Sequence, residues 1–415
     1  MTQPIIIWII SLAAIAGVII RPFRIAEAVW AVAGAALLVI FTLITPADAA
    51  HGIAKGTDVY LFLLGMMLLA EVAREEMLFH WLAAQAANYA QGSAKRLFLL
   101  IYTVGIIVTT FLSNDATAVV LTPAVAAACR AARVSKPLPY LFICAFIANA
   151  ASFVLPISNP ANLVLYASHM PALLQWLPRY ILPSLFSIGF TYFMLYWTQR
   201  NDLREPIEKD LERAKLTSTG KTAAIGILAT AVVLLLASAF DIPLGLPTAI
   251  TGILTTIIVL LAAKKSPATI VKGISWSVLP LVAGLFVIVE ALNKTGLIRT
   301  LGTLLTNSAT RSVNQTAWTS GIGIALLSNG MNNLPTGLIA ADAIRATHLP
   351  EIIRSAILIG VDLGPNLSVT GSLATILWLV ALKREGQAVS AWTFLKLGML
   401  VMTPALLAAL AALFI

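Results

Sequence analysis

The sequence predicts an all-α membrane protein whose chain crosses the bilayer many times. Of its 415 residues, 59% are apolar and only 11% are charged, and the mean hydropathy is +0.92. Soluble domains are ~45–50% apolar and ~25% charged, so this composition excludes a soluble multidomain enzyme. Because one spanning helix needs ~20 mostly apolar residues, the chain has room for roughly ten spans and their connections.

Eight uninterrupted apolar runs predict eight of these spans. They cover about 4–20, 28–45, 59–73, 174–198, 221–240, 246–263, 277–291 and 391–414. Four further segments are apolar but contain polar residues, glycine or proline: 95–134, 138–170, 315–347 and 352–383. Two amphipathic stretches, about 75–91 and 294–309, are too polar to span and are expected to lie along the interface.

The two halves of the chain repeat the same order of features. The matching pairs are Gly65 with Gly284 and Glu71 with Glu290, 219 residues apart, and Asn114-Asp115 with Asn332-Asn333, 218 residues apart. A nearly constant spacing of this kind indicates a duplicated unit. We therefore expect a first repeat over 1–197, a charged linker over 198–221 and a second repeat over 222–415.

The topology depends on how two of the interrupted segments enter the membrane. If about 95–134 and 315–347 are re-entrant hairpins, each half has five full crossings, and this odd number places the halves in opposite orientations. With the N-terminus outside, 20 of the 27 Lys and Arg residues fall on the cytoplasmic side, as the positive-inside rule requires. We expect ten transmembrane helices plus two re-entrant helical hairpins in two inverted repeats, with a cytoplasmic linker and both termini outside. If either hairpin crossed the membrane instead, the number of spans would differ.

Four polar breaks interrupt these segments at places that match between the halves. A broken helix at membrane depth is tolerated only against protein or a water-filled cavity. The free N–H groups and the positive end of the following half-helix can bind oxygen or anionic groups, and matched broken helices indicate a transporter site. A single asparagine can instead cap or join helices, but that role does not explain four matched clusters. The breaks are 113–117, 155–162, 330–336 and 362–372.

Asp115 and Asp362 are the carboxyl groups within these breaks. An intramembrane carboxylate costs ~2.5–3.5 kcal/mol on insertion scales and is a functional candidate by default. Burial penalises its charged form, so such a group can take up and release a proton. The alternative is a structural carboxylate that caps its half-helix. No Lys or Arg lies within the breaks to neutralise either residue.

Other chemistry finds no support in the sequence. The two cysteines, Cys129 and Cys144, form neither a CxxC pair nor a cluster with histidine, so no disulfide framework or metal site is expected. The chain has no GxxxxGK[ST], GxSxG or HExxH motif, and we therefore expect a transporter without ATPase activity of its own and not an enzyme. The net charge of +9 follows from the topology and does not indicate nucleic-acid binding.

The broken segments resemble the arsenical efflux permease family, part of an ion transporter superfamily that also contains carboxylate, citrate and sodium–proton carriers. The resemblance extends over about 58–382, and its most specific part is the last motif. The motifs are Phe111-LSNDATAVVLTP-Ala124, Leu155-PISNPANLV-Leu165, Gly330-MNNLPT-Gly337 and Asp362-LGPNLSVTGSLATILW-Leu379.

This resemblance implies a secondary active transporter of the inner membrane that exports arsenite or antimonite. Export would be driven by proton exchange, with Asp115 and Asp362 as the proton-coupling candidates, or paired with a separate soluble, arsenite-stimulated ATPase. The implied solute site lies where two hairpin tips meet two broken helices. Its residues are Asn114, Asp115, Thr117, Asn159, Asn162, Asn332, Asn333, Thr336, Asn366, Ser368, Thr370 and Ser372.

The chemistry of these side chains suits a neutral solute. Arsenous acid is uncharged at pH 7 and presents three hydroxyls, which match amide and hydroxyl partners, and silicic acid would fit the same groups. A carboxylate carrier would need Arg or Lys at the breaks, and sodium–proton exchange is a further alternative within the superfamily. A passive channel ranks lower, because hairpins that meet near the midplane favour an occluded site. We expect no cofactor and no bound metal, with protons, the metalloid and lipid as partners.

Overall fold

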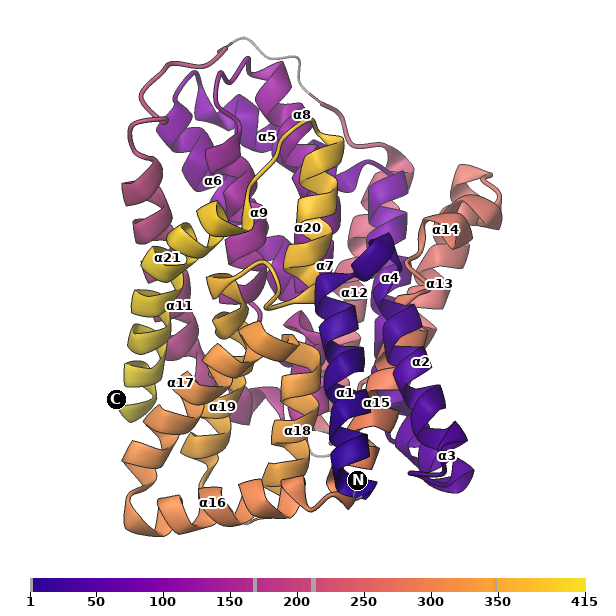
Figure 1. Cartoon of the computed structure of the whole chain (residues 1–415). Coiled ribbons are helices and arrows are strands. Elements are labelled where there is room, and N and C mark those ends of the chain that lie inside the picture. The colour runs from indigo at the N-terminus through magenta and orange to yellow at the C-terminus, as the bar shows by residue number, and fades with distance from the viewer. Residues whose placement is uncertain (1–2, 167–169, 210–213, 346, 348) are drawn as a thin grey trace.

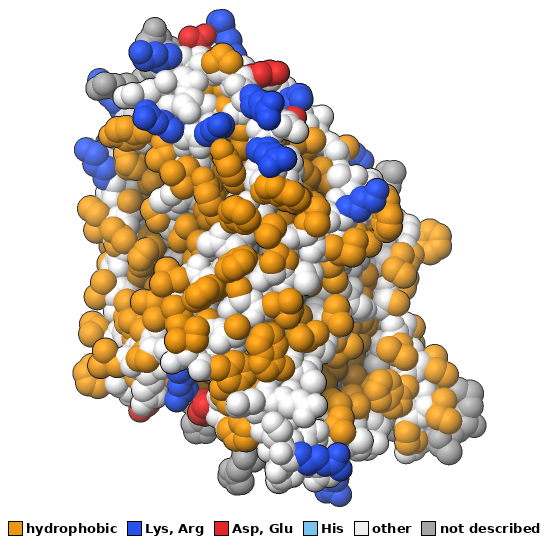
Figure 2. Space-filling model, turned by 90° about the vertical axis from the view of Figure 1, so that its left-hand side faces the viewer, with side chains coloured by type: hydrophobic (Ala, Val, Ile, Leu, Met, Phe, Trp, Pro, Cys, Tyr) orange, Lys and Arg blue, Asp and Glu red, His pale blue; other side chains and the backbone are white. Residues whose placement is uncertain are grey.

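The computed structural model describes residues 3–166, 170–209, 214–345, 347 and 349–415, and all regular secondary structure within them is helical. Six helices are long and apolar enough to cross a membrane, or up to eight if each of two bent pairs forms one span. Figure 2 shows an apolar belt between two ends that carry the charged side chains. The predicted all-α, multi-pass membrane class is confirmed.

The helices of the first half follow the predicted segments closely. They are α1 (Gln3–Ile20), α2 (Glu27–Ile40), α3 (Pro46–Lys55), α4 (Thr57–Glu75), α5 (Leu78–Ala90), α6 (Ala94–Phe111), α7 (Asn114–Ala116), α8 (Thr122–Ala131), α9 (Leu138–Ala150), α10 (Pro160–Tyr166) and α11 (Leu173–Gln199). Short 3₁₀ or π turns join them at η1 (Pro22–Arg24), η2 (Thr117–Leu121) and η3 (Pro156–Ser158).

The helices of the second half also largely follow the predicted segments. Its helices are α12 (Ser218–Ala239), α13 (Gly245–Ala263), α14 (Pro267–Gly273), α15 (Val278–Lys294), α16 (Leu297–Arg311), α17 (Val313–Met331), α18 (Asn333–Arg345), α19 (Glu351–Leu363), α20 (Leu373–Arg384) and α21 (Ala391–Ala411). The turns are η4 (Gly364–Leu367) and η5 (Ala412–Phe414). Both termini lie at the end of the molecule that α16 crosses, and the chain between α11 and α12 lies at the opposite end (Figure 1).

Ion pairs hold the loops together at both ends. At the end that holds the linker, Arg130 Nη1 lies 2.5 Å from Glu385 Oε2, and Lys136 Nζ donates to Asp202 Oδ1 at 2.7 Å. At the other end, Arg179 of α11 pairs with Glu351 of α19 at 2.9 Å. Charged groups thus mark the two ends of the apolar belt.

The helices form two groups that Figure 1 shows side by side. The flanking bundle consists of α1–α4 and α12–α15, where α4 packs against α13 and α2 against α15. The broken-helix bundle consists of α5–α11 and α16–α21, where α17 packs against α19 and α11 against α21. The bundles meet, among other places, where α15 contacts α18 and α4 contacts α10.

The chain reverses direction twice inside the broken-helix bundle. The first reversal is at Leu112 and Ser113, between α6 and α8, and α5 packs against both of these helices. The second reversal is at Asn332, between α17 and α18, and α16 packs against both. Two other helices are interrupted without reversal, α9–α10 over 151–159 and α19–α20 over 364–372. All four interruptions overlap the breaks that the sequence predicts.

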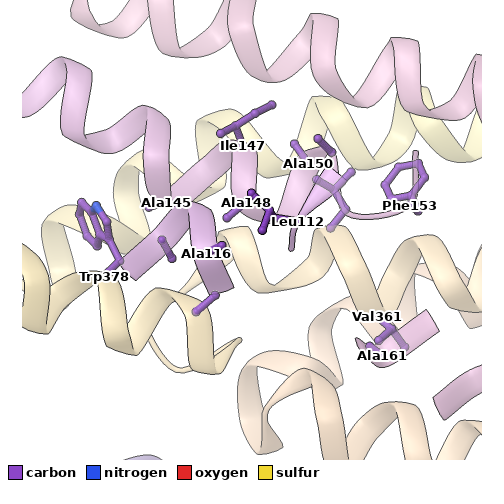
Figure 3. Close-up of a cluster of buried hydrophobic side chains, with 14 of the residues drawn as sticks. Leu112, Ala116, Ala145, Ile147, Ala148, Ala150, Phe153, Ala161, Val361 and Trp378 are labelled. Atoms are coloured by element: carbon purple, nitrogen blue, oxygen red, sulfur yellow. The ribbon is translucent and has the colours of Figure 1, made fainter. Parts of the chain in front are cut away.

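Apolar packing fixes the first reversal against its neighbours. Leu112 and Ala116 lie in a buried cluster with Ile147 and Ala148 of α9, all at most 4% exposed (Figure 3). Trp378 of α20 belongs to the same cluster, and its indole N–H donates to the Leu141 carbonyl oxygen at 2.9 Å. This close packing fixes the position of the polar residues of the first reversal.

The flanking bundle depends on close backbone contact between α4 and α13. A Cβ atom on Gly65 would lie 2.2 Å from the Thr248 carbonyl oxygen, and one on Gly252 would lie 2.6 Å from the Gly65 oxygen. Small residues at such crossings let helices in membranes approach closely. The packing of this bundle therefore requires glycine at both positions.

We predict that Gly65→Ala lowers the unfolding temperature in detergent, because overpacking of this kind costs ~1–3 kcal/mol. Gly189→Ala in α11 is the matched control, since nothing lies within 4 Å of its added Cβ, and it should leave the unfolding temperature unchanged. Equal unfolding temperatures for both variants would contradict the close α4–α13 contact.

Candidate functional site

A cavity lies between the two bundles, where the reversals and the broken helices meet. Six of the twelve predicted site residues line it: Asn114, Asp115, Asn159, Asn332, Asn333 and Ser372. The opposite wall comes from the flanking bundle and is mostly apolar, with Leu63 of α4 and Val282 and Leu285 of α15. The cavity volume available to water is about 40 Å³. This is room for roughly three waters at ~10–15 Å³ each.

The first reversal presents an amide and a carboxylate to this cavity. Ser113 is extended, and its Oγ accepts a hydrogen bond from Ala116 N at 3.2 Å, which starts the next helix. Asn114 Oδ1 accepts from Asp115 N at 2.9 Å. The N–H groups of Asp115 and Ala116 are thus satisfied within the reversal, and the side chains of Asn114 and Asp115 are its polar contribution to the cavity lining.

The second reversal has an unusual backbone. Asn332 has φ 73° and ψ 152°, a region that glycine occupies and other residues rarely adopt. Its Oδ1 accepts from Leu334 N at 3.2 Å, and Asn333 N donates to the Gly371 carbonyl oxygen at 2.9 Å. The second reversal is therefore joined directly to the α19–α20 break.

One amide–carboxyl contact and one amide–amide contact join the broken helices of the two halves. Asn159 Nδ2 donates to Asp362 Oδ1 at 2.8 Å, and Asn149 Nδ2 donates to Asn366 Oδ1 at 3.0 Å. Asn366 Nδ2 in turn donates to the Phe146 carbonyl oxygen at 2.9 Å. These side chains are at most 2% exposed, so the α9–α10 and α19–α20 breaks are held together by buried hydrogen bonds.

The other six predicted residues support the site from behind, and they do not line the cavity. Thr117, Asn162, Thr336, Asn366, Ser368 and Thr370 form hydrogen bonds within the reversals and breaks. Asn162, for example, donates to the Ser152 carbonyl oxygen at 2.9 Å, and Ser368 donates to Asn329 Oδ1 at 2.7 Å. Asp362 is fully buried and does not line the cavity, but it accepts a hydrogen bond from Asn159, which does.

Sequence reasoning missed three polar residues of this region. Glu27, in the first turn of α2, lines the cavity from the flanking bundle and pairs with Arg21. The only sequence feature that could have identified Glu27 as a site residue is its position as an acidic residue at the start of an apolar run. Asn149 and Asn329 support the breaks from helices that precede them, and their signal was an amide within an otherwise apolar segment.

The cavity is electrostatically one-sided. Asp115 and Glu27 contribute carboxyl groups, and among the described residues that line the cavity there is no Lys, Arg or His. The described part of the chain also contains no group of three or more His, Cys, Asp or Glu placed to hold a metal ion. The arrangement offers hydrogen-bond donors and acceptors to a small polar guest, and it would repel an anion.

Comparison with known proteins places this geometry in a family. The sequence model of the citrate transporter family, CitMHS, matches residues 5–365. The chain belongs to this family. Two solved structures have a similar fold and are also transporters, which agrees with the multi-pass architecture of a CitMHS protein.

Several similar curated proteins are named arsenical pump membrane proteins, which confirms the resemblance in the sequence motifs. The arsenical pump membrane protein of Yersinia enterocolitica is 28% identical over 361 residues, which cover 84% of each chain. The protein of the same name from Escherichia coli K12 is 28% identical over 366 residues, again 84% of each chain.

The two similar structures show the fold alone, because their sequence identities are low. The YdaH transporter of Alcanivorax borkumensis has a TM-score of 0.57 at 14% identity, over 88% of this chain and 86% of its own. The antimetabolite efflux pump MtrF of Neisseria gonorrhoeae has a TM-score of 0.54 at 15% identity, over 91% of this chain and 83% of its own.

Proposed function

We propose that this protein is a secondary active transporter that exports arsenite or antimonite across the inner membrane in exchange for protons. The observation that carries the proposal is the cavity of asparagine amides between the two reversals, with carboxyl groups and no cationic lining. Arsenous acid is a small neutral molecule with three hydroxyls, which can donate to carboxylates and accept from amides. The names of the similar arsenical pumps support the same solute.

We further propose ten spans and two re-entrant hairpins in two inverted repeats. The hairpins are α6–α8 and α17–α18, each with its two arms against one interfacial helix. The termini at one end and the linker at the other support an odd number of crossings in each half. With 198–221 in the cytoplasm, the positive-inside rule then places both termini outside.

Alternating access follows from the two walls of the cavity. One wall belongs to the flanking bundle and the other to the broken-helix bundle. Movement of one bundle against the other can expose the reversals first to one side of the membrane and then to the other. The solute then travels with the residues that bind it, and Asp115 and Asp362 are the carboxyl groups available to carry a proton.

Two other solutes remain candidates. Silicic acid is also small, neutral and rich in hydroxyls, so it would use the same amides. Citrate is favoured by the family description, but a trianion would face Asp115, and Arg21, the cation beside the cavity, is outside its lining and already paired with Glu27, which makes the trianion costly in a low-dielectric site. We therefore rank citrate and other carboxylates below arsenite, and a passive channel or a sodium–proton exchanger lower still.

The test is transport by the purified protein in liposomes without ATP. An imposed pH gradient should drive accumulation of arsenite into vesicles whose lumen is acidic, and a protonophore should abolish it. Excess antimonite should compete, while citrate should not. Arsenite flux that ignores the gradient, or flux of citrate alone, would contradict the proposal, and a requirement for ATP and a second protein would show the pump to be a subunit of an ATPase.

A thiol mechanism is not part of this proposal. Cys129 and Cys144 are buried, at 1% and 0% exposed, and neither lines the cavity. A buried free cysteine behaves as a small apolar residue, so we predict that the double variant Cys129→Ala/Cys144→Ala keeps at least half of the arsenite transport rate. Loss of transport with normal protein yield would implicate a thiol in export.

A further inference from the structure

The carboxyl group of Asp362 is enclosed behind the cavity with one oxygen unsatisfied. The side chain is 0% exposed, and Oδ1 accepts from Asn159 Nδ2 at 2.8 Å. Oδ2 has no hydrogen-bond partner among the described residues. The neighbouring Ser152 hydroxyl donates its one proton to the Asn149 carbonyl oxygen at 2.8 Å.

The surroundings of Asp362 supply no counter-charge. Helix α19 packs against α9, α10, α11, α17, α18 and α21, and α17 carries no ionisable side chain. The ionisable groups on the other five are Tyr140, Cys144, Tyr166, Arg179, Tyr180, Tyr192, Tyr196, Asp342, Arg345 and Lys396; on α19 itself they are Glu351 and Arg354. No ion pair joins Asp362 to any of them. An ionised carboxylate whose neighbours are two neutral groups, the Asn159 amide and the Ser152 hydroxyl, with no cation, is costly in such a place, and a proton on Oδ2 removes that cost.

Asn159 links this carboxyl group to the cavity. Its Oδ1 accepts from Ala161 N at 3.0 Å, which fixes the amide so that Nδ2 points at Asp362. The same residue lines the cavity beside Pro160. Any polar group that binds at Asn159 is therefore one side chain away from Asp362.

We propose that Asp362 carries the exchanged proton and that Asn159 is the positioning residue that couples it to the solute. This inference rests on the proposed function. Arsenite and the water that enters with it bring hydroxyl donors to Asn159 and so favour the ionised carboxylate. When the bundles move and water reaches the enclosed carboxyl group, the O–H bond of Asp362 breaks, its proton passes to that water, and the carboxylate keeps the hydrogen bond from Asn159. On the other side of the membrane arsenite leaves and water returns a proton to Oδ2.

The exchange makes arsenite binding and proton binding compete. We expect arsenite binding to the purified protein in weak buffer to release about one proton per site. Below the titration of Asp362, the affinity should fall about tenfold for each unit decrease in pH. The probe is sodium arsenite, compared with a choline-based medium to detect any sodium requirement.

Substitutions assign the proton to its residue. Asp362→Asn keeps the shape and should bind arsenite with no proton release and no pH dependence. Asp342→Asn is the matched control on α18, since Asp342 pairs with Arg345 at 3.0 Å and does not line the cavity. This variant should keep both the proton release and the pH dependence of arsenite binding. Asn159→Ala should weaken proton release and flatten the pH profile more than it weakens binding.

A second measurement avoids dependence on folding of the variants. Arsenite added to the wild-type protein should remove an infrared band of a protonated carboxyl group. Proton release that survives in Asp362→Asn, or no change in that band, overturns the inference, as does binding that depends on sodium and ignores pH. If the wild-type protein binds no arsenite at any pH, the proposed function fails; if it binds arsenite without proton release, only the proton assignment fails.

Discussion

Asn332→Ala should reduce the apparent affinity for arsenite by at least tenfold and abolish accumulation at low arsenite concentrations. Asn332 lines the cavity at the second reversal, so alanine removes an amide from the solute. Alanine keeps the β-carbon on a backbone with φ 73° and ψ 152°, a conformation that costs ~1–3 kcal/mol for residues other than glycine, and it loses the Asn332 Oδ1 contact with Leu334 N that holds this backbone in place. Both effects act at the same point of the site.

A glycine variant separates the two effects. Asn332→Gly adopts the backbone of the second reversal without penalty but also lacks the amide. We therefore expect Asn332→Gly to unfold at a higher temperature than Asn332→Ala, with the same loss of arsenite affinity. Wild-type affinity in Asn332→Gly would remove the Asn332 side chain from the solute site.

Asp115→Asn should raise the arsenite concentration for half-maximal transport by about 10- to 150-fold, because a hydrogen bond to a charged group contributes ~1.5–3 kcal/mol. Asp115 presents its carboxyl to the cavity from the first half-helix, and it can accept donors from the solute hydroxyls. The substituted amide has one acceptor oxygen in place of two.

The pH profile distinguishes Asp115 from Asp362. If Asp115 only binds the solute, the residual affinity of Asp115→Asn should still fall as the pH is lowered, whereas Asp362→Asn should lose that dependence. Equilibrium binding of radioactive arsenite over a range of pH values measures both. If the arsenite affinity of Asp115→Asn were independent of pH and that of Asp362→Asn still fell at low pH, Asp115 would be the proton carrier and Asp362 would not.

The positions of the broken helices could be predicted from the sequence because the cause is local. Pro156 lies in the α9–α10 break, Pro160 begins α10 and Pro365 lies in the α19–α20 break, and proline cannot continue the hydrogen-bond ladder of a helix. The segments 95–134 and 315–347, for which hairpins are predicted, contain the chain reversals between α6 and α8 and between α17 and α18.

Which polar residue faces the cavity could not be predicted, because it depends on hydrogen bonds between distant segments. Asn159 and Asn162 lie three residues apart in one break, yet the first lines the cavity and the second bonds to backbone oxygens of its own segment. Glu27 was missed because its place at the cavity depends on how the α1–α2 turn packs against the other bundle. Tertiary packing determines which of these polar side chains line the cavity, and it produces no periodic pattern in the sequence.

Anomalous diffraction at the arsenic absorption edge, from crystals grown with arsenite, tests most directly whether the two reversals form the solute site. The account predicts one strong arsenic peak in the cavity, within hydrogen-bonding reach of the side chains of Asn114 and Asn332. An arsenic peak beside Cys129 or Cys144, or an empty cavity in a protein that transports arsenite, would contradict it.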